Sequence, residues 1–354
     1  MNSIELNVEE LYSRIHSHLS RAKENVLRSI DTELLITYWN IGKEIVEEEQ
    51  KGSKRAEYGK ALIQNISDRL TKEFGKGYGK STLNDMRKFY ITYPDLENIF
   101  HTVRGKLMMH SQLSWAHYRL LMRLPKEQRG FYQIEAAQNK WSSRELERQM
   151  SSLLFERLSK SKDKEGVLAL SKKGQEIVTP QDAIKDPIIL EFLGLPESNL
   201  LVESDVEEAL VSQLQHFLIE LGKGFAFVAR QKRITLDGDH FYADLVFYHT
   251  ILKCYIIIDI KTRKLSHADL GQIQLYVNYF DKEEVTEGDN PTIGLILCTQ
   301  KNDTVVKYML GDENKQIFAS KYQFHLPTEH ELEVEINREL QKIQTNFKVM
   351  SNEG

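Results

Sequence analysis

Apolar residues recur at every third or fourth position through most of the first 160 residues. This spacing is typical of amphipathic helices. Long helices are expected over 5–50, and another over 55–74. The apolar positions that define the first run are Leu11, Ile15, Leu19, Val26 and Ile30. Further helices are predicted over 111–123, 127–138 and 142–160, so the N-terminal part of the chain is predicted to be all helical.

The pattern changes between residues 160 and 187, where charged residues, Gly and Pro are mixed. Such a composition is typical of a domain junction, although GVLALSKKGQ within it favours a helix. Two domains are therefore expected, at 1–174 and 175–354, and the length of 354 residues is enough for two cores.

The second domain alternates helices with strand-like runs. A helical run over 203–221 precedes three runs rich in aromatic and β-branched residues, and a helix and a further strand follow. The runs predicted as strands are 225–236, 239–249, 253–261 and 292–300, and the helix covers 267–281. A charged final helix is expected over 328–345.

Three charged residues stand near the ends of two of these strands. A tight turn near 249–252 would join the second and third strands in a hairpin, which can bring Asp244 beside Asp259. Asp259 and Lys261 are two residues apart on one strand and so share a face. Two carboxylates and an ammonium at a buried strand end are costly unless a ligand uses them, and a hard divalent cation would.

The spacing Asp-x14-Asp-x-Lys, in this order of helices and strands, resembles the PD-(D/E)XK nuclease superfamily. The whole chain is similar to the YhcG family of bacterial proteins, in which a helical N-terminal domain precedes such a nuclease domain. The segments that carry the resemblance are YGKALIQNISDRLTKEFGKGYGKSTLNDMRKFY, LSWAHYRLL, FLGLPE, FLIELGKGFAFVARQ and GQIQLYVNYFD. The resemblance implies an α/β restriction-endonuclease-like domain with a central mixed sheet and a metal-dependent nuclease activity on DNA.

Phosphodiester hydrolysis suits the trio chemically. Asp244, Asp259 and the main-chain carbonyl of Ile260 would hold Mg²⁺ or Mn²⁺, which favour oxygen ligands. Lys261 would orient or deprotonate the attacking water and offset the developing negative charge. The alternative for Lys261 is a salt bridge to Asp259. The family usually has Glu at the position of Asp259, which changes the reach of the ligand but not its type.

Four other residues are assigned to the site. By the resemblance, Glu220 matches an acidic residue that many superfamily members contribute, and Gln272 matches the family's GQ motif, where the amide could hold the water or a phosphate oxygen. Arg230 and Gln231 lie in the first strand, and Arg230 could clamp a phosphate. The alternatives are a solvated Glu220, a surface Gln272, and pairing of Arg230 with Glu220 or Asp244.

A basic segment precedes this domain. Residues 51–150 hold 19 Lys and Arg against 10 Asp and Glu, although the net charge of the chain is −5. Within it, GKGYGKS separates two helical runs, with Ser81 as the expected N-cap, and this outline predicts a helix-turn-helix. An ordinary helical hairpin is the alternative. The residues expected to contact nucleic acid are Lys80, Thr82, Asn84, Arg87 and Lys88.

The remaining features bound the protein class. No apolar stretch reaches membrane-spanning length, the acidic N-terminus does not resemble a secretory signal, and Cys254 and Cys298 are expected as buried thiols, so a cytoplasmic location is predicted. DNA is the expected partner, with RNA as an alternative substrate and a homodimer as the expected assembly. The competing interpretation is a DNA-binding or assembly protein that does not cleave.

Overall fold

This computed structural model describes residues 3–51, 56–96, 113–159, 164–195, 201–301, 306 and 316–326. The chain divides into two compact units, Met1–Arg148 and Gln149–Gly354. The division lies earlier than the expected boundary at 174/175, so the residues from 149 onward belong with the second unit. The helix predicted over 328–345 lies outside the described residues.

The first unit is helical, as its periodicity predicts. Its helices are α1 (Ser3–Lys51), α2 (Ala56–Phe74), the 3-10 turn η1 (Lys76–Tyr78), α3 (Lys80–Thr92), α5 (Trp115–Leu121) and α6 (Lys126–Gln138), and the division falls within α7 (Ser143–Ser151). The run over 5–50 is therefore one helix of 49 residues, α1.

Close packing of α1 against α3 builds the core of this unit. Gly42 permits it, because a Cβ atom at this position would lie 2.1 Å from the main-chain oxygen of Met86. Trp39 lies buried beside it, and its indole Nε1 donates to the main-chain oxygen of Tyr93 at 2.8 Å. Trp115 packs edge-on against Phe89 at 5.3 Å between ring centroids. These contacts use only the C-terminal part of α1 and fix α3 in place.

The order α2–η1–α3 gives the predicted helix, short turn and helix. The expected N-cap at Ser81 is wrong, because α3 already begins at Lys80 and its N-cap is Gly79, which has no side chain to cap the helix. Gly75 has a φ of +93°, a left-handed conformation that glycine adopts without a steric penalty. The glycines of this segment thus serve the turn itself.

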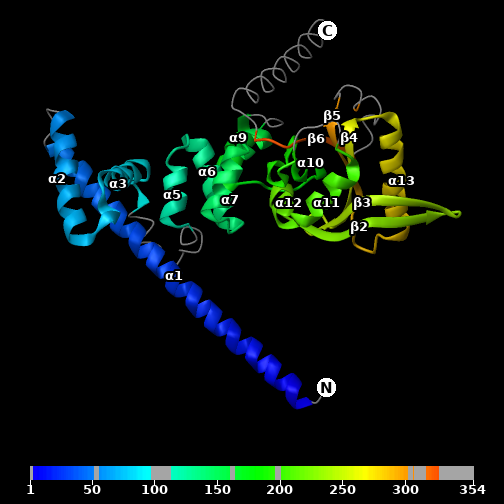
Figure 1. The fold of residues 1–354 in the computed structure, drawn as a ribbon, viewed down its shortest axis with the longest axis horizontal. Coiled ribbons are helices and arrows are strands. Elements are labelled where there is room, and N and C mark those ends of the chain that lie inside the picture. Colours follow the sequence, from blue (N-terminus) through cyan, green and yellow to red (C-terminus); the bar gives the residue numbers. More distant parts are fainter. Residues whose placement is uncertain are drawn as a thin grey trace, which may run out of the picture. The chain divides into compact units, whose positions relative to one another are not determined.

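The second unit holds a six-stranded mixed sheet (Figure 1). Its strand order is β1-β6-β5-β4-β3-β2, in which β2, β3 and β4 are antiparallel and β4, β5, β6 and β1 are parallel. The strands are β1 (Ile188–Ile189), β2 (Phe225–Leu236), β3 (Asp239–His249), β4 (Cys254–Lys264), β5 (Ile293–Gln300) and β6 (Ile317–Gln323). The predicted strands and hairpin are confirmed.

Helices cover both faces of the sheet. The helices that begin in this unit are α8 (Leu154–Ser159), α9 (Lys164–Lys173), α10 (Pro180–Ala183), η3 (Glu191–Leu193), α11 (Glu203–Ser212), α12 (Leu214–Leu221) and α13 (His267–Glu283). Helix α13 packs on the face that carries Val246, Ile257 and Ile296, whereas α11 and α12 pack on the opposite face. The run predicted as one helix over 203–221 is thus interrupted at Gln213, between α11 and α12.

Both cysteines are buried free thiols, as predicted. Among the helices that the structure describes, none is long and apolar enough to cross a membrane.

Candidate active site

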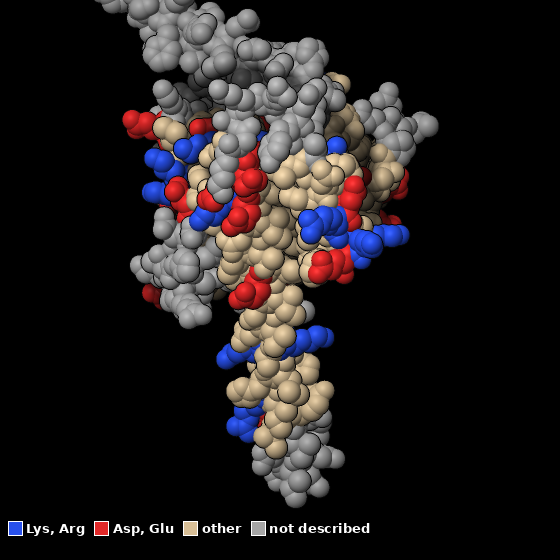
Figure 2. Space-filling model, turned by 90° about the vertical axis from the view of Figure 1, so that its left-hand side faces the viewer, with Lys and Arg blue, Asp and Glu red and all other residues tan. Residues whose placement is uncertain are grey.

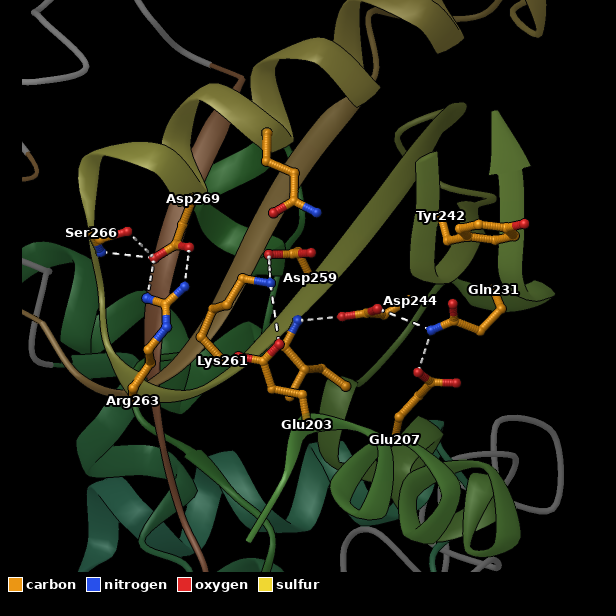
Figure 3. A network of polar contacts seen from close by, with 12 residues as sticks. Glu203, Glu207, Gln231, Tyr242, Asp244, Asp259, Lys261, Arg263, Ser266 and Asp269 are labelled. Atoms are coloured by element: carbon orange, nitrogen blue, oxygen red, sulfur yellow. Dashed lines mark hydrogen bonds and ion pairs between the residues drawn. The ribbon is translucent and has the colours of Figure 1, made fainter. Parts of the chain in front are cut away.

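The predicted trio comes together where the pairing of β3 with β4 ends, in the middle of both strands rather than at their ends (Figure 3). The antiparallel register pairs Leu245 with Ile258, which sets Asp244 beside Asp259 on the neighbouring strand. Nζ of Lys261 lies 2.9 Å from Oδ2 of Asp259. The alternation of side chains along β4 places both residues on the face of Ile257, the face that α13 covers.

The carboxylate of Asp259 is fully buried and poorly satisfied. Its exposure is 0%, and neither of its oxygens accepts a hydrogen bond of good geometry; the ammonium of Lys261 is its ion-pair partner. Burial raises the pKa of Asp259 to about 7, against the lowering effect of Lys261. A buried carboxylate without hydrogen-bond donors is unstable as an anion unless a cation compensates it.

Burial also affects the pKa of Lys261, but neighbouring charges outweigh its effect. Desolvation lowers the pKa of the ammonium, and the nearby carboxylates of Asp259 and Glu203 more than offset this, so that the pKa is raised overall. Oε2 of Glu203, in the first turn of α11, lies 3.6 Å from Nζ of Lys261. A helix thus supplies the second acid, whereas Asp259 belongs to the same strand as Lys261. Lys261 is therefore a charged group held between acids.

Asp244 is held by hydrogen bonds from two strands. Its Oδ2 accepts from the main-chain N–H of Ile260 at 2.8 Å, and its Oδ1 accepts from Nε2 of Gln231 at 3.0 Å. Burial nevertheless raises the pKa of Asp244, against these bonds. The side chain of Gln231 also donates to Glu207, so one amide connects Asp244 to α11 (Figure 3).

Glu203 and Glu207 are site residues that the sequence analysis missed. They lie one turn apart at the start of α11, and both contact residues of the trio or their partners. The available signal was the acidic sequence ESDVEE, in which residues four apart share a helix face. The first core helix therefore supplies its acids from its beginning rather than from Glu220.

The residues present fit a small divalent cation. Among the residues that the structure describes, no three His, Cys, Asp or Glu side chains form a complete metal site. Mg²⁺, however, keeps several waters and is commonly bound by one or two carboxylates. The unsatisfied oxygens of Asp259, with Asp244 beside them, supply that kind of oxygen donor.

Comparisons with known proteins find matches for both parts of the chain. Residues 181–340 match the family model described as the YhcG PDDEXK nuclease domain, and residues 14–157 match the DUF1016 N-terminal domain. The chain is 35% identical over 366 residues to the Escherichia coli (strain K12) protein called "Putative nuclease YhcG", covering 96% of this chain and 97% of that one. The chain belongs to the YhcG family.

Two solved structures each resemble part of this YhcG-family chain. A repair endonuclease from Pyrococcus abyssi is 18% identical over 37% of this chain and 50% of its own, with a TM-score of 0.25. EndoMS in its apo form is 15% identical over 37% of this chain and 49% of its own, with the same TM-score. The family membership and the sheet topology identify the second unit as restriction-endonuclease-like.

Glu220, which the family resemblance assigned to the site, lies elsewhere in the second unit. Its Oε1 is 2.6 Å from Nη1 of Arg157, and both side chains are fully buried. The same oxygen accepts from the main-chain N–H of Ile189 at 3.0 Å. These contacts join α12 to α8 and β1 and favour a structural role, so the assignment of Glu220 to the trio is not supported by the geometry.

Arg230 also differs from its assignment. Its guanidinium pairs with Glu207, rather than with Glu220 or Asp244 as the alternative held. Gln231, its neighbour, has a φ of +47°, which is uncommon for a residue other than glycine. This backbone conformation accompanies the contact that the Gln231 amide makes with Asp244.

Gln272 lies half-buried on α13, the helix that covers the face of the sheet carrying Ile257. Its Nε2 donates to Oη of Tyr276 at 2.7 Å, and that hydroxyl donates to the main-chain oxygen of Tyr242 at 2.9 Å. The electrostatic influence of Asp259 and Asp244 reaches Tyr276 and contributes to its raised pKa, of which burial is the largest cause. Gln272 is thereby connected to β3 close to Asp244.

A second ion pair fixes the start of α13. The guanidinium of Arg263 donates to both oxygens of Asp269, at 2.7 and 2.8 Å. Asp269 also accepts from the main-chain N–H and the hydroxyl of Ser266, the N-cap, both at 2.8 Å. Although burial opposes it, these donors lower the pKa of Asp269 to about 2.

The five residues of α3 predicted to contact nucleic acid fall into two groups, one exposed and one half-buried. Lys80, Asn84 and Lys88 follow one another at intervals of four residues and are exposed. Thr82 is half-buried, and Arg87 pairs with Glu49 of α1 at 2.6 Å. Arg87 is therefore engaged within the unit, and the exposed row consists of Lys80, Asn84 and Lys88.

Proposed function

We propose that this chain is a metal-dependent endonuclease that hydrolyses phosphodiester bonds in DNA. The observation that carries the proposal is the buried carboxylate of Asp259, which has the ammonium of Lys261 at 2.9 Å and no well-formed hydrogen bond on either oxygen. Such a carboxylate favours a bound cation. Membership of a family with a PDDEXK nuclease domain supports the same reaction class.

Asp244, Asp259 and the main-chain carbonyl of Ile260 would hold Mg²⁺ or Mn²⁺. When bound, the ion supplies an activated water and polarises the scissile phosphate. The chain itself contributes the orientation of these oxygens: Asp244 is fixed by the N–H of Ile260 and by Gln231. Asp244 therefore keeps its position without a large rearrangement.

We assign Lys261 to charge stabilisation rather than proton removal. Its ammonium lies between the carboxylates of Asp259 and Glu203, both of which favour the charged form. A charged ammonium at this place can donate a hydrogen bond to a phosphate oxygen as negative charge develops there. Gln272, anchored through Tyr276, would hold the water or a second phosphate oxygen.

For the first unit we propose DNA binding through the exposed row on α3. Lys80 and Lys88 carry the positive charge, and Asn84 can contact a phosphate or a base edge. The excess of 19 Lys and Arg over 10 Asp and Glu in 51–150 supports a polyanionic partner. A homodimer would supply two active sites, one for each strand of a duplex.

The test is a cleavage assay on linear, single-stranded and branched DNA, and on RNA, with Mg²⁺ or Mn²⁺. The variants are Asp259→Ala and Lys261→Ala, and the matched controls are Glu283→Ala and Lys282→Ala, which change exposed residues at the end of α13. Metal-dependent DNA cleavage that both site variants lose and both controls retain is the expected result.

Two other outcomes would replace this proposal. Cleavage confined to RNA would keep the site and change the substrate. Absence of cleavage, with salt-dependent DNA binding equal in the wild type and the site variants, would establish the alternative of a DNA-binding or assembly protein that uses the fold without its chemistry.

A further inference from the structure

One face of α1 carries a row of large apolar side chains that the first unit leaves uncovered. Their exposed fractions range from 38% to 67%, although helices of globular proteins normally turn such a face toward a core. The row consists of Leu11, Tyr12, Ile15, Leu19, Val26, Ile30 and Leu34. Figure 2 shows the corresponding stem, with few charged side chains on the face turned to the viewer.

This row differs in direction from the part of α1 that packs. Leu35, Trp39 and Val46 are buried, and at about 100° per residue they lie on the side of the helix opposite to Ile15, Leu19 and Val26. Up to Leu34 the row thus lies away from that packed side, and beyond Leu34 it leads to Ile41 and to the buried Ile45. Contiguous apolar surface of several hundred Å² is uncommon on monomeric proteins and is typical of interaction sites.

The spacing of the row is symmetric about its own middle. From Leu11 through Ile15, Leu19, Val26 and Ile30 to Leu34, the intervals are four, four, seven, four and four residues. A second copy of α1 turned end for end about the 22/23 position therefore meets the first in matching levels. Leu11 comes level with Leu34, Ile15 with Ile30, and Leu19 with Val26.

From this symmetry we infer that two copies of the chain associate through an antiparallel pairing of their α1 helices along this row. A two-fold axis at 22/23 makes the contact self-complementary, as a closed dimer requires.

The size of the row meets what a dimer needs. Residues 11 to 34 span about 35 Å of helix. Seven large apolar side chains, each about half-exposed, offer on the order of 500 Å² of apolar surface. A standard interface buries about 800 Å² per partner, of which a little over half is apolar. The row alone supplies that apolar share.

A groove at the end of the row is placed to receive the second helix. It lies between α1 and α2, has a volume of about 500 Å³, and is lined by Thr37, Ile41, Ile45, Leu62 and Ile66 among others. In the antiparallel register, the first turns of the second copy's α1 come level with Thr37 and Ile41. The groove and the row thus form one continuous surface for the same occupant.

The first experiment measures the mass of the full chain by light scattering at micromolar concentration. We expect a dimer, and we expect Leu19→Glu and Val26→Glu to halve the mass while the unfolding temperature of the second unit stays the same. Ser13→Glu and Ser17→Glu are the matched controls, because they add the same charge to exposed positions on the opposite side of α1. A monomeric wild type, or a dimer that Leu19→Glu leaves intact, would overturn the inference.

Cysteine cross-linking decides the orientation. The natural cysteines are buried, so a new surface thiol reports on its own surroundings. Ala22→Cys lies beside the proposed axis and should form a disulfide between copies, whereas Ile15→Cys would lie about 22 Å along the helix from its copy and should not. Equal cross-linking of both variants would indicate parallel helices and refute the antiparallel pairing. Circular dichroism of each variant shows whether the helical unit remains folded.

Discussion

Gln231 donates a hydrogen bond to Asp244 across the β2–β3 pair, at 3.0 Å, from a backbone with a φ of +47°. A left-handed residue other than glycine costs about 1 kcal/mol or more. Strain of this kind persists where surrounding structure fixes it, and it is frequent at functional sites. Here it accompanies the positioning of a proposed metal ligand.

Two substitutions of Gln231 separate strain from function. Gln231→Ala and Gln231→Gly both remove the hydrogen bonds to Asp244 and Glu207, so both should reduce metal affinity and cleavage on the order of 10–100-fold. Only glycine adopts the left-handed φ without strain. The free energy of unfolding of Gln231→Gly should therefore be about 1 kcal/mol higher than that of Gln231→Ala. Urea titration and metal titration check this. Equal stability of the two variants would contradict it, and Gln64→Ala is a surface control.

The pair of Arg157 and Glu220 should matter for stability rather than for cleavage. Arg157→Ala leaves a buried carboxylate without its partner and should cost about 3–5 kcal/mol in the free energy of unfolding. Glu220→Gln should also destabilise, but the fraction that remains folded should cleave at the wild-type rate. Loss of cleavage in a well-folded Glu220→Gln protein would return Glu220 to the catalytic set.

Low pH should remove the contribution of Asp269 to the free energy of unfolding. Its pKa of about 2 in the folded protein lies below the ordinary value of 3.8, so the unfolded chain takes up the proton first. The stabilisation is complete above about pH 4 and disappears as the pH falls through 2. Asp269→Asn should therefore lower the free energy of unfolding by about 2 kcal/mol at pH 7 and by much less near pH 2. Denaturant titrations at both pH values, with the exposed Asp205→Asn as control, measure the difference; a pH-independent loss would contradict it.

The exposed row on α3 predicts a salt effect. Lys80→Ala and Lys88→Ala should each weaken DNA binding and lower the slope of log affinity against log salt concentration by about one. Lys126→Ala, which removes an exposed lysine of α6, is the control. Unchanged slopes in both α3 variants would show that α3 does not contact phosphates.

A truncation tests the boundary between the units. The fragment 149–354 keeps Arg157 with Glu220 and should be soluble and unfold cooperatively. The fragment 175–354 follows the boundary expected from composition and lacks Arg157, so it should aggregate or unfold at a lower temperature. Equal stability of the two fragments, by scanning calorimetry, would show that residues 149–174 add nothing to the second unit.

The features that the sequence predicted are those set by neighbouring residues. Asp244, Asp259 and Lys261 meet because one hairpin and one strand fix their distances, and both can be recognised from local patterns. The acids of α11 could not be assigned in this way. Which turn of a helix approaches a strand depends on packing, and here the beginning of α11, rather than the end of α12, contacts the site.

Contacts between distant residues escaped prediction for the same reason. Glu220 and Arg157 are 63 residues apart in the chain, and the pattern around Glu220 is that of an ordinary helix end. In α1 the periodicity correctly predicted a helix, but the same apolar spacing describes a face that packs in a core and a face left uncovered. Periodicity identifies the face without its partner.

The buried pair of Arg157 and Glu220 also bears on how such chains evolve. Arg157 is the last residue matched by the DUF1016 N-terminal family, and Glu220 lies within the match to the nuclease family, yet the two side chains share one interior. Suppose that recombination between residues 158 and 180 joined either family segment to an unrelated neighbour. The resulting chain would keep only one partner of the Arg157–Glu220 ion pair. Selection against that loss would tend to keep the two segments together in descendants, even where their activities diverge.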